Sequence, residues 1–96
     1  MLTGKQRRHL RALAHSLRPV VQLGKDGIDE GVIAAVDRAL ADHELVKVKV
    51  GEAASLDRDT AANEIASQTA SEVAQILGNM VLLYRAREEN PTIELP

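Results

Sequence analysis

Residues 19–50 read PVVQLGKDGIDEGVIAAVDRALADHELVKVKV, and this stretch decides the fold. Its first apolar run, Val20–Leu23, is short and β-branched, which predicts a strand. A helical pattern follows over residues 29–43, with Asp29 as the capping residue. Residues 45–50 alternate between valines on one side and Leu, Lys and Lys on the other, which is typical of a half-exposed strand. Strand, helix and strand over this length predict a parallel, right-handed crossover.

Three further segments complete the predicted fold. The pattern favours a helix over residues 3–17, which Pro19 ends, and another over residues 57–68. Apolar runs at residues 73–77 and 80–85 are joined by Gly-Asn, a two-residue hairpin signal. The order is α-β-α-β-α-β-β, and we expect an α/β fold: a two-layer sandwich with a four-stranded mixed sheet. Local pattern does not fix the strand order.

The first predicted helix has an apolar stripe beside a cationic one. The apolar stripe consists of Leu10, Leu13, Ala14 and Leu17, and the cationic stripe of Arg7, Arg8, Arg11, His15 and Arg18. Steps of three, four and seven residues return to the same side of a helix, so each set forms one surface. We expect the apolar stripe to pack and the cationic stripe to face outward.

Charge is distributed unevenly along the chain. The net charge is −2, but six basic residues and no acid precede Asp26, and all fourteen acids lie from Asp26 onward. This asymmetry indicates a polyanionic partner, although a solvated basic face balanced by an acidic tail explains it equally well. The chain has no Phe or Trp and a single Tyr, so recognition of bases by aromatic stacking is expected to be minor.

The loop Gly24-Lys25-Asp26-Gly27 has a GxxG spacing between a predicted strand and a predicted helix. Glycines permit a close approach of backbone to a ligand, and the N-terminus of the next helix offers free amides. With Lys25 as a cation, the loop is a candidate phosphate contact of the kind seen in KH domains. A tight strand-to-helix turn is the alternative explanation. Lys47 and Lys49 on the half-exposed strand form a further basic element.

The sequence offers little for catalysis or cofactors. Histidines are scattered without metal-ligand spacing, serines lack a nucleophile context, and the chain has no cysteine. We therefore expect no enzyme activity, no cofactor, no metal and no small-molecule substrate. A small phosphate-ligand enzyme built on the glycine loop is disfavoured because no base or nucleophile accompanies that loop.

Residues 1–96 are expected to form one domain, in which residues 86–96 are a charged tail docked through Ile93 and Leu95. The N-terminus does not resemble a signal peptide, and no run is apolar enough to span a bilayer. We expect a cytoplasmic protein without membrane contact.

The ordered motifs resemble the CRM domain, in its stand-alone bacterial YhbY-like form. Four segments carry the resemblance over nearly the whole chain: LTGKQR with LRALAH at residues 2–15, PVVQLGKDGI at residues 19–28, HELVKVKV at residues 43–50 and GNMVLLYR at residues 78–85. The resemblance implies a fold similar to the C-terminal domain of bacterial translation initiation factor three. It also implies RNA binding without catalysis, in ribosome biogenesis on precursors of the large subunit.

Carried onto this chain, the resemblance and the charge pattern give one set of expected RNA contacts. These are Gly24, Lys25, Asp26 and Gly27 of the GxxG loop, with Arg7, Arg8, Arg11, Arg18, Lys47 and Lys49 around it. A protein-interaction module that works on the ribosome with little direct RNA contact is the alternative function, which the acidic net charge and tail favour.

Two residues depart from the family pattern. Asp26 places an acid inside the loop where phosphate is expected to approach. Thr69-Ala70 stands at a turn where relatives often carry Thr-Gly.

Overall fold

A computed structural model describes residues 1–96 and contains the seven predicted elements in the predicted order. Their bounds are α1 (Gly4–Ala14), β1 (Pro19–Leu23), α2 (Glu30–His43), β2 (Leu45–Val50), α3 (Arg58–Thr69), β3 (Glu72–Leu77) and β4 (Met80–Tyr84). Most bounds lie within one residue of the prediction, which is the ordinary spread at element ends. None of the helices has the length and apolar character that crossing a membrane requires.

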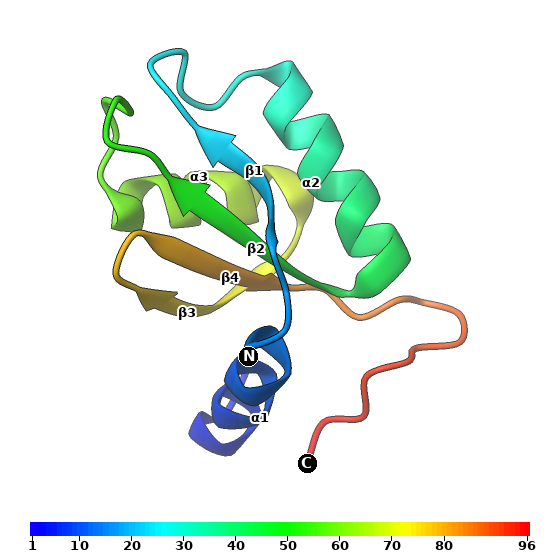
Figure 1. Cartoon of the computed structure of the whole chain (residues 1–96). Coiled ribbons are helices and arrows are strands. Elements are labelled where there is room, and N and C mark those ends of the chain that lie inside the picture. Colours follow the sequence, from blue (N-terminus) through cyan, green and yellow to red (C-terminus); the bar gives the residue numbers. More distant parts are fainter.

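The four strands form one mixed sheet in the order β1-β2-β4-β3 (Figure 1). β1 and β2 are parallel, as the strand-helix-strand pattern predicts, and β4 pairs antiparallel with both β2 and β3. β1 and β3 therefore form the edges of the sheet, while β2 and β4 lie in the centre. The carboxyl ends of β1 and β2 meet the β3–β4 hairpin at the same end of the sheet.

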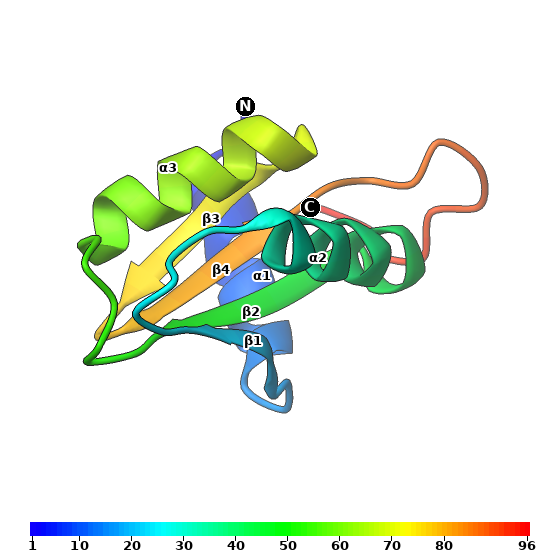
Figure 2. The same cartoon turned by 90° about the horizontal axis from the view of Figure 1, so that it is seen from above.

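Alternation along β2 divides the apolar interior into two clusters. Val46, Val48 and Val50 face α2 and α3 and belong to the main core of 12 buried residues. Leu45 faces the opposite side, where it joins a second cluster of 7 buried residues that α1 covers. Figures 1 and 2 show α2 and α3 together on one side of the sheet and α1 on the other.

The α/β class and the mixed four-stranded sheet are as predicted, and the structure adds a short third layer. The two-layer description did not anticipate that α1 packs on the face opposite α2 and α3. Sequence periodicity gives a helix its apolar side but does not say which face of a sheet that side will cover.

The first helix is shorter than predicted. It begins as expected, since Thr3 caps it and shares a reciprocal capping box with Gln6. It ends at Ala14 rather than Leu17, and the Leu17 amide closes a turn onto the Ala14 carbonyl. Leu10 and Ala14 are buried against the sheet, whereas Leu13 is 41% exposed, contrary to its predicted place in the packed stripe. The buried contact of α1 therefore includes fewer residues than the predicted stripe.

The turn after α3 explains one departure from the family pattern. Ala70 has the left-handed backbone conformation with φ 54°, where glycine is the favoured residue because it has no Cβ. Thr69 is buried beside it and donates from its hydroxyl to the Ile65 carbonyl. The alanine at position 70 therefore keeps the turn at some conformational cost.

Glu44 is the most connected polar residue of the fold. It follows α2 with φ 66°, and its amide donates to the Leu40 carbonyl. Its own carbonyl accepts from the Arg85 amide at the end of β4, at 2.9 Å. The side chain is fully buried, so the carboxylate needs partners within the protein.

The C-terminal segment supplies those partners. The Glu44 carboxylate accepts from the amides of Arg87, Thr92 and Ile93 and from the Thr92 hydroxyl, at 2.6–3.0 Å. Burial raises the pKa of Glu44, but these hydrogen bonds outweigh burial and lower the pKa to about 2. The tail then packs Ile93 and Leu95 against the α1-side cluster, as predicted.

We predict that Glu44→Gln lowers the free energy of unfolding by about 1–3 kcal/mol near pH 7. The pKa of Glu44 is lowered in the folded state, so its contribution is present above the ordinary value of 4.5 and is lost as the pH falls toward about 2. Urea denaturation should therefore show parent and variant converging as the pH falls through that range.

The matched control is Glu89→Gln, which neutralises an exposed glutamate of the same tail. This variant should follow the parent at every pH. An equal gap between Glu44→Gln and the parent near pH 7 and near pH 3 would contradict the assigned role of the carboxylate.

Candidate nucleic-acid interface

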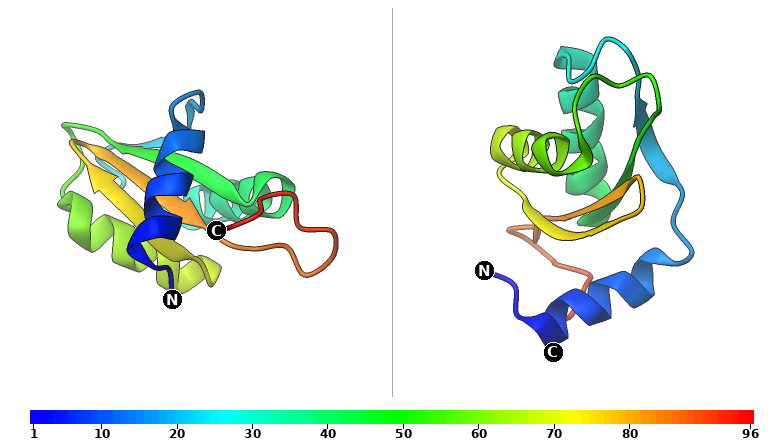
Figure 3. Two further views of the ribbon diagram at one scale, coloured as in Figure 1. Left: turned by 90° about the horizontal axis from the view of Figure 1, so that it is seen from below. Right: turned by 90° about the vertical axis from the view of Figure 1, so that its left-hand side faces the viewer.

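The face of the sheet on the α1 side is only partly covered, and its open part carries lysines. Directly paired residues place Gln22, Lys49, Met80 and Leu77 in one row across β1, β2, β4 and β3. The next row inward contains Lys47, Leu82 and Gln75. Figure 3 (left view) shows α1 crossing this face, with the β3–β4 hairpin extending beyond the helix.

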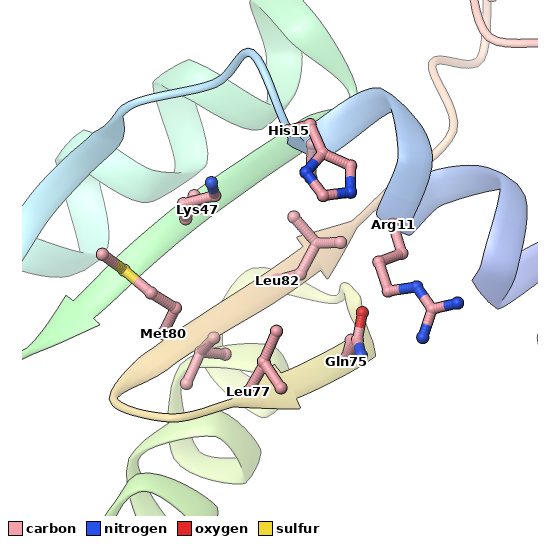
Figure 4. Close-up of a pocket in the computed structure, with 9 residues that line it drawn as sticks. Arg11, His15, Lys47, Gln75, Leu77, Met80 and Leu82 are labelled. Atoms are coloured by element: carbon pink, nitrogen blue, oxygen red, sulfur yellow. The ribbon is translucent and has the colours of Figure 1, made fainter.

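A cavity of about 120 Å³ lies where α1 meets the open part of the sheet. We call it the α1 cavity, and six of its lining residues are Arg11, His15, Lys47, Gln75, Leu77 and Met80. Leu82 is another of the lining residues and is largely buried. Figure 4 shows Arg11 and His15 reaching it from α1, while Lys47, Met80 and Gln75 come from three neighbouring strands.

The structure brings together several of the basic residues that sequence separates. Arg11 and Lys47 line the same cavity, although 36 positions divide them in the chain (47 − 11). The Lys47 ammonium donates to the Leu17 carbonyl at 3.1 Å, which ties β2 to the segment between α1 and β1. Arg18 lines a second hollow on the other side of Lys47.

We use the term cationic face for the surface that these side chains share. Its members are Arg8, Arg11, Arg18, Lys47 and Lys49. Arg8 is exposed and stands three residues before Arg11, on the same side of α1. Lys49 belongs to the same face because it is two residues from Lys47 along a strand.

Arg7 is different, because its guanidinium is occupied by the fold. It donates to the carbonyls of Val73 and Ala74, at the irregularity where β3 shifts register against β4. β3 is an edge strand, so these carbonyls have no strand partner on that side. We therefore assign Arg7 to anchoring α1 on β3, where the prediction placed it among free basic contacts.

The GxxG loop forms a tight turn at the carboxyl end of β1. The Gly27 amide donates to the Gly24 carbonyl at 3.0 Å, and Lys25 and Asp26 are exposed at the tip. Gly27 has φ 65°, which favours glycine. Gly24 has neither a positive φ nor any atom within 4 Å of the place where a Cβ would stand. Folding of the turn therefore requires glycine at position 27 but not at position 24.

Gly51 fixes this turn relative to β2. Its amide donates to the Leu23 carbonyl at 2.9 Å, and a Cβ at position 51 would lie 2.6 Å from the same oxygen. The close approach holds the end of β1 against the end of β2. It places the turn beside the row that contains Gln22 and Lys49, since Lys25 is three positions after Gln22 and the chain between them spans at most about 10 Å.

The N-terminus of α2 is not the open anion site that the sequence suggested. The Asp29 carboxylate accepts from the Val32 amide at 2.8 Å, and Glu30 adds a second acid in the first turn. These charges already interact with the positive end of the helix. Contact with phosphate at the turn would therefore depend on Lys25 and on the backbone around Gly24.

The acidic residues of α2 and α3 lie on the side of the sheet opposite the cationic face: Glu30, Asp37, Asp42, Asp59 and Glu64. Other exposed acids are nearer to it, since Asp26 is at the tip of the GxxG turn, Glu52 follows β2, and Glu94 stands between the two tail residues that pack on the α1 side. On the α1 side, Glu72 of β3 is paired with the N-terminal amine at 3.4 Å. The uneven charge of the sequence thus becomes, for the helices, a difference between the basic α1 side and the acidic α2 and α3 side.

Sequence reasoning missed the polar and apolar neighbours of the cationic face. Gln22, Gln75, Leu77 and Met80 lie beside the basic residues only because of the strand order and register. The alternation of β4 gave a partial signal, since it placed Met80 and Leu82 on one side, but not their partners. No group of three or more His, Asp or Glu side chains is placed to hold a metal ion.

Comparison with known proteins agrees with this architecture. Residues 2–85 match the CRS1/YhbY (CRM) domain. The chain is 41% identical over 96 residues to the Bacillus subtilis protein named "Probable RNA-binding protein YqeI", covering all of both chains. It is 43% identical over 95 residues to a Haemophilus influenzae protein named "RNA-binding protein", covering 99% of this chain and 95% of that one.

A solved structure is similar over the whole length. The solution structure of the hypothetical protein SAV1595 from Staphylococcus aureus matches with a TM-score of 0.82 and 45% sequence identity, and each chain is covered completely. Sequence and structure agree, and the chain belongs to the CRS1/YhbY (CRM) domain family.

Proposed function

We propose that this chain is a non-catalytic, cytoplasmic RNA-binding protein that assists assembly of the large ribosomal subunit. The observation that carries the proposal is the cationic face, which lies beside the GxxG turn and opposite the acidic helices. The names of the relatives support RNA as the polyanion. The ribosomal step comes from the family resemblance.

The proposed mechanism is electrostatic and depends on shape. Exposed arginines and lysines neutralise phosphates and release counterions, which gives affinity without sequence preference. The turn at Gly24 offers backbone that a sugar-phosphate chain can approach closely, because no side chain fills the space there. Asp26 at the same tip and the acidic helices would repel phosphate, so the RNA is held to one side of the protein.

The first prediction from the proposed function concerns the ribosomal role. The tagged protein should co-sediment with precursors of the large subunit on a sucrose gradient of cell lysate. That position should be lost after RNase treatment or in moderate salt. A position only at the top of the gradient would contradict stable association with ribosomal particles. Association that survives RNase and salt would favour protein contacts instead.

A second prediction tests the cationic face with a matched pair of arginines. Arg11→Glu should weaken binding of the purified protein to RNA by about tenfold and reduce the salt dependence of binding. Arg38→Glu makes the same change on an exposed position of α2, in the acidic layer. It should leave the affinity within about twofold of the parent. Equal effects of the two substitutions would show that net charge, rather than the face, determines binding.

The third prediction concerns the turn. Gly24→Ala should leave the thermal midpoint unchanged, because the Cβ meets open space and φ is ordinary. The same variant should lose RNA affinity several-fold if the backbone is approached closely. Lys25→Glu should also fold and bind RNA more weakly, since Lys25 is exposed at the tip. If both variants bind RNA as tightly as the parent, the turn does not contact RNA.

A further inference from the structure

We infer that the α1 cavity receives one unpaired nucleobase of an RNA strand, while the neighbouring phosphates lie on the cationic face. The inference rests on the proposed RNA-binding function and adds the kind of RNA that the surface takes. It adds a contact with a base, whereas the sequence predicted contacts mainly with the RNA backbone.

The size of the α1 cavity fits a single ring system. Its volume is about 120 Å³, whereas sites for cofactors and drug-sized ligands are roughly 300–1,000 Å³. An enclosed cavity of about 150 Å³ holds a benzene molecule. The α1 cavity is smaller but open to solvent, so one ring can enter it in part while its outer edge stays outside. The α1 cavity opens on the same face as the lysines of β2, so a base that enters it remains attached to a backbone outside.

The lining suits a flat heterocycle. Five of its nine residues are hydrophobic. Leu77 is 66% exposed and Met80 is half-buried, so both present apolar surface that no other part of the protein covers. A methionine thioether packs favourably on aromatic rings. The Gln75 amide carries both donors and an acceptor, which can hydrogen-bond the edge of a base.

Planar side chains for stacking are also present, although the chain lacks Phe and Trp. Tyr84 is buried and cannot take part. His15 and Arg11 are exposed, stand one helical turn apart and reach the α1 cavity from α1 (Figure 4). Imidazole rings and guanidinium planes are among the groups on which unstacked RNA bases lie.

Charge selects the occupant. Arg11 and Lys47 lie at the α1 cavity, and Lys49 is in the next row beside Met80. An apolar ligand without phosphates would make no ion pair with these cations. A nucleotide can pack its base on the apolar lining and place its phosphate beside the cations. A base in a duplex is paired and stacked, so only single-stranded segments, loops or bulges can supply the occupant.

The two methionines permit a direct test. With 13C-methyl methionine, the protein gives one signal from Met80 in the α1 cavity and one from Met1, which is fully exposed at the N-terminus. Titration with a single-stranded RNA oligonucleotide should shift the Met80 signal through the ring current of a base and leave Met1 in place. The blunt duplex of the same sequence should not produce that shift.

Two leucine-to-serine variants test the effect of the α1 cavity on RNA affinity. Leu77→Ser should weaken binding of the single-stranded oligonucleotide about five- to tenfold and leave its salt dependence and the duplex affinity unchanged, because no phosphate contact is lost. Leu13→Ser is the control, since Leu13 is also exposed on the α1 side but lies outside the α1 cavity.

The outcomes separate the inference from the proposed function. An unmoved Met80 signal while RNA is bound in the same sample overturns the base contact and leaves RNA binding intact. Equal losses for Leu77→Ser and Leu13→Ser also overturn it. If neither RNA binds the parent protein, both the inference and the proposed function fail.

Discussion

The Glu44 carboxylate is the interaction on which the arrangement of this protein depends. The Glu44 backbone ends α2 in a left-handed conformation directly before β2, and its carbonyl accepts from the amide of Arg85, which follows β4. The Glu44 side chain collects three amides and one hydroxyl from the tail. A buried carboxylate without these donors would be strongly destabilising. The tail therefore covers the end of the sheet where β2 begins and β4 ends. It also supplies the hydrogen bonds that the buried Glu44 carboxylate needs.

Once β2 starts at Leu45, alternation assigns every following side chain to a face. The valines enter the core beneath α2 and α3, and the lysines come out on the side of α1. Gly51 then allows β1 and β2 to end in close contact, which sets the position of the GxxG turn. The cationic face is thus a consequence of strand register. The helix α1 completes it because Arg7 anchors the helix on the edge strand while Arg11 remains free.

Much of the fold was predictable because its signals are local. Thr3, Asp29 and Asp57 cap the three helices, and each stands at the first position of a predicted helical segment. Alternation located β2, and Gly-Asn located the hairpin. The role of Arg7, the exposure of Leu13 and the layer formed by α1 could not be predicted. Each depends on which face of the sheet α1 covers, and that choice is made by contacts between segments far apart in the chain.

The candidate site shows the same division. The basic residues were visible as charges, but their roles differ with position: Arg7 donates to carbonyls of β3, and Lys47 donates to a carbonyl of the segment between α1 and β1. The structure also revises how the glycine loop would bind phosphate. Asp29 occupies the end of α2, so the helix terminus adds little attraction for phosphate. What the turn retains is an open backbone at Gly24 next to Lys25.

Attraction for RNA must then come chiefly from the cationic face, and the acids at the tip of the turn and on the helices limit the orientations in which an RNA strand can approach. A chain with a negative net charge can bind a polyanion on these terms, because what the RNA meets is the potential of one face and not the sum over the molecule.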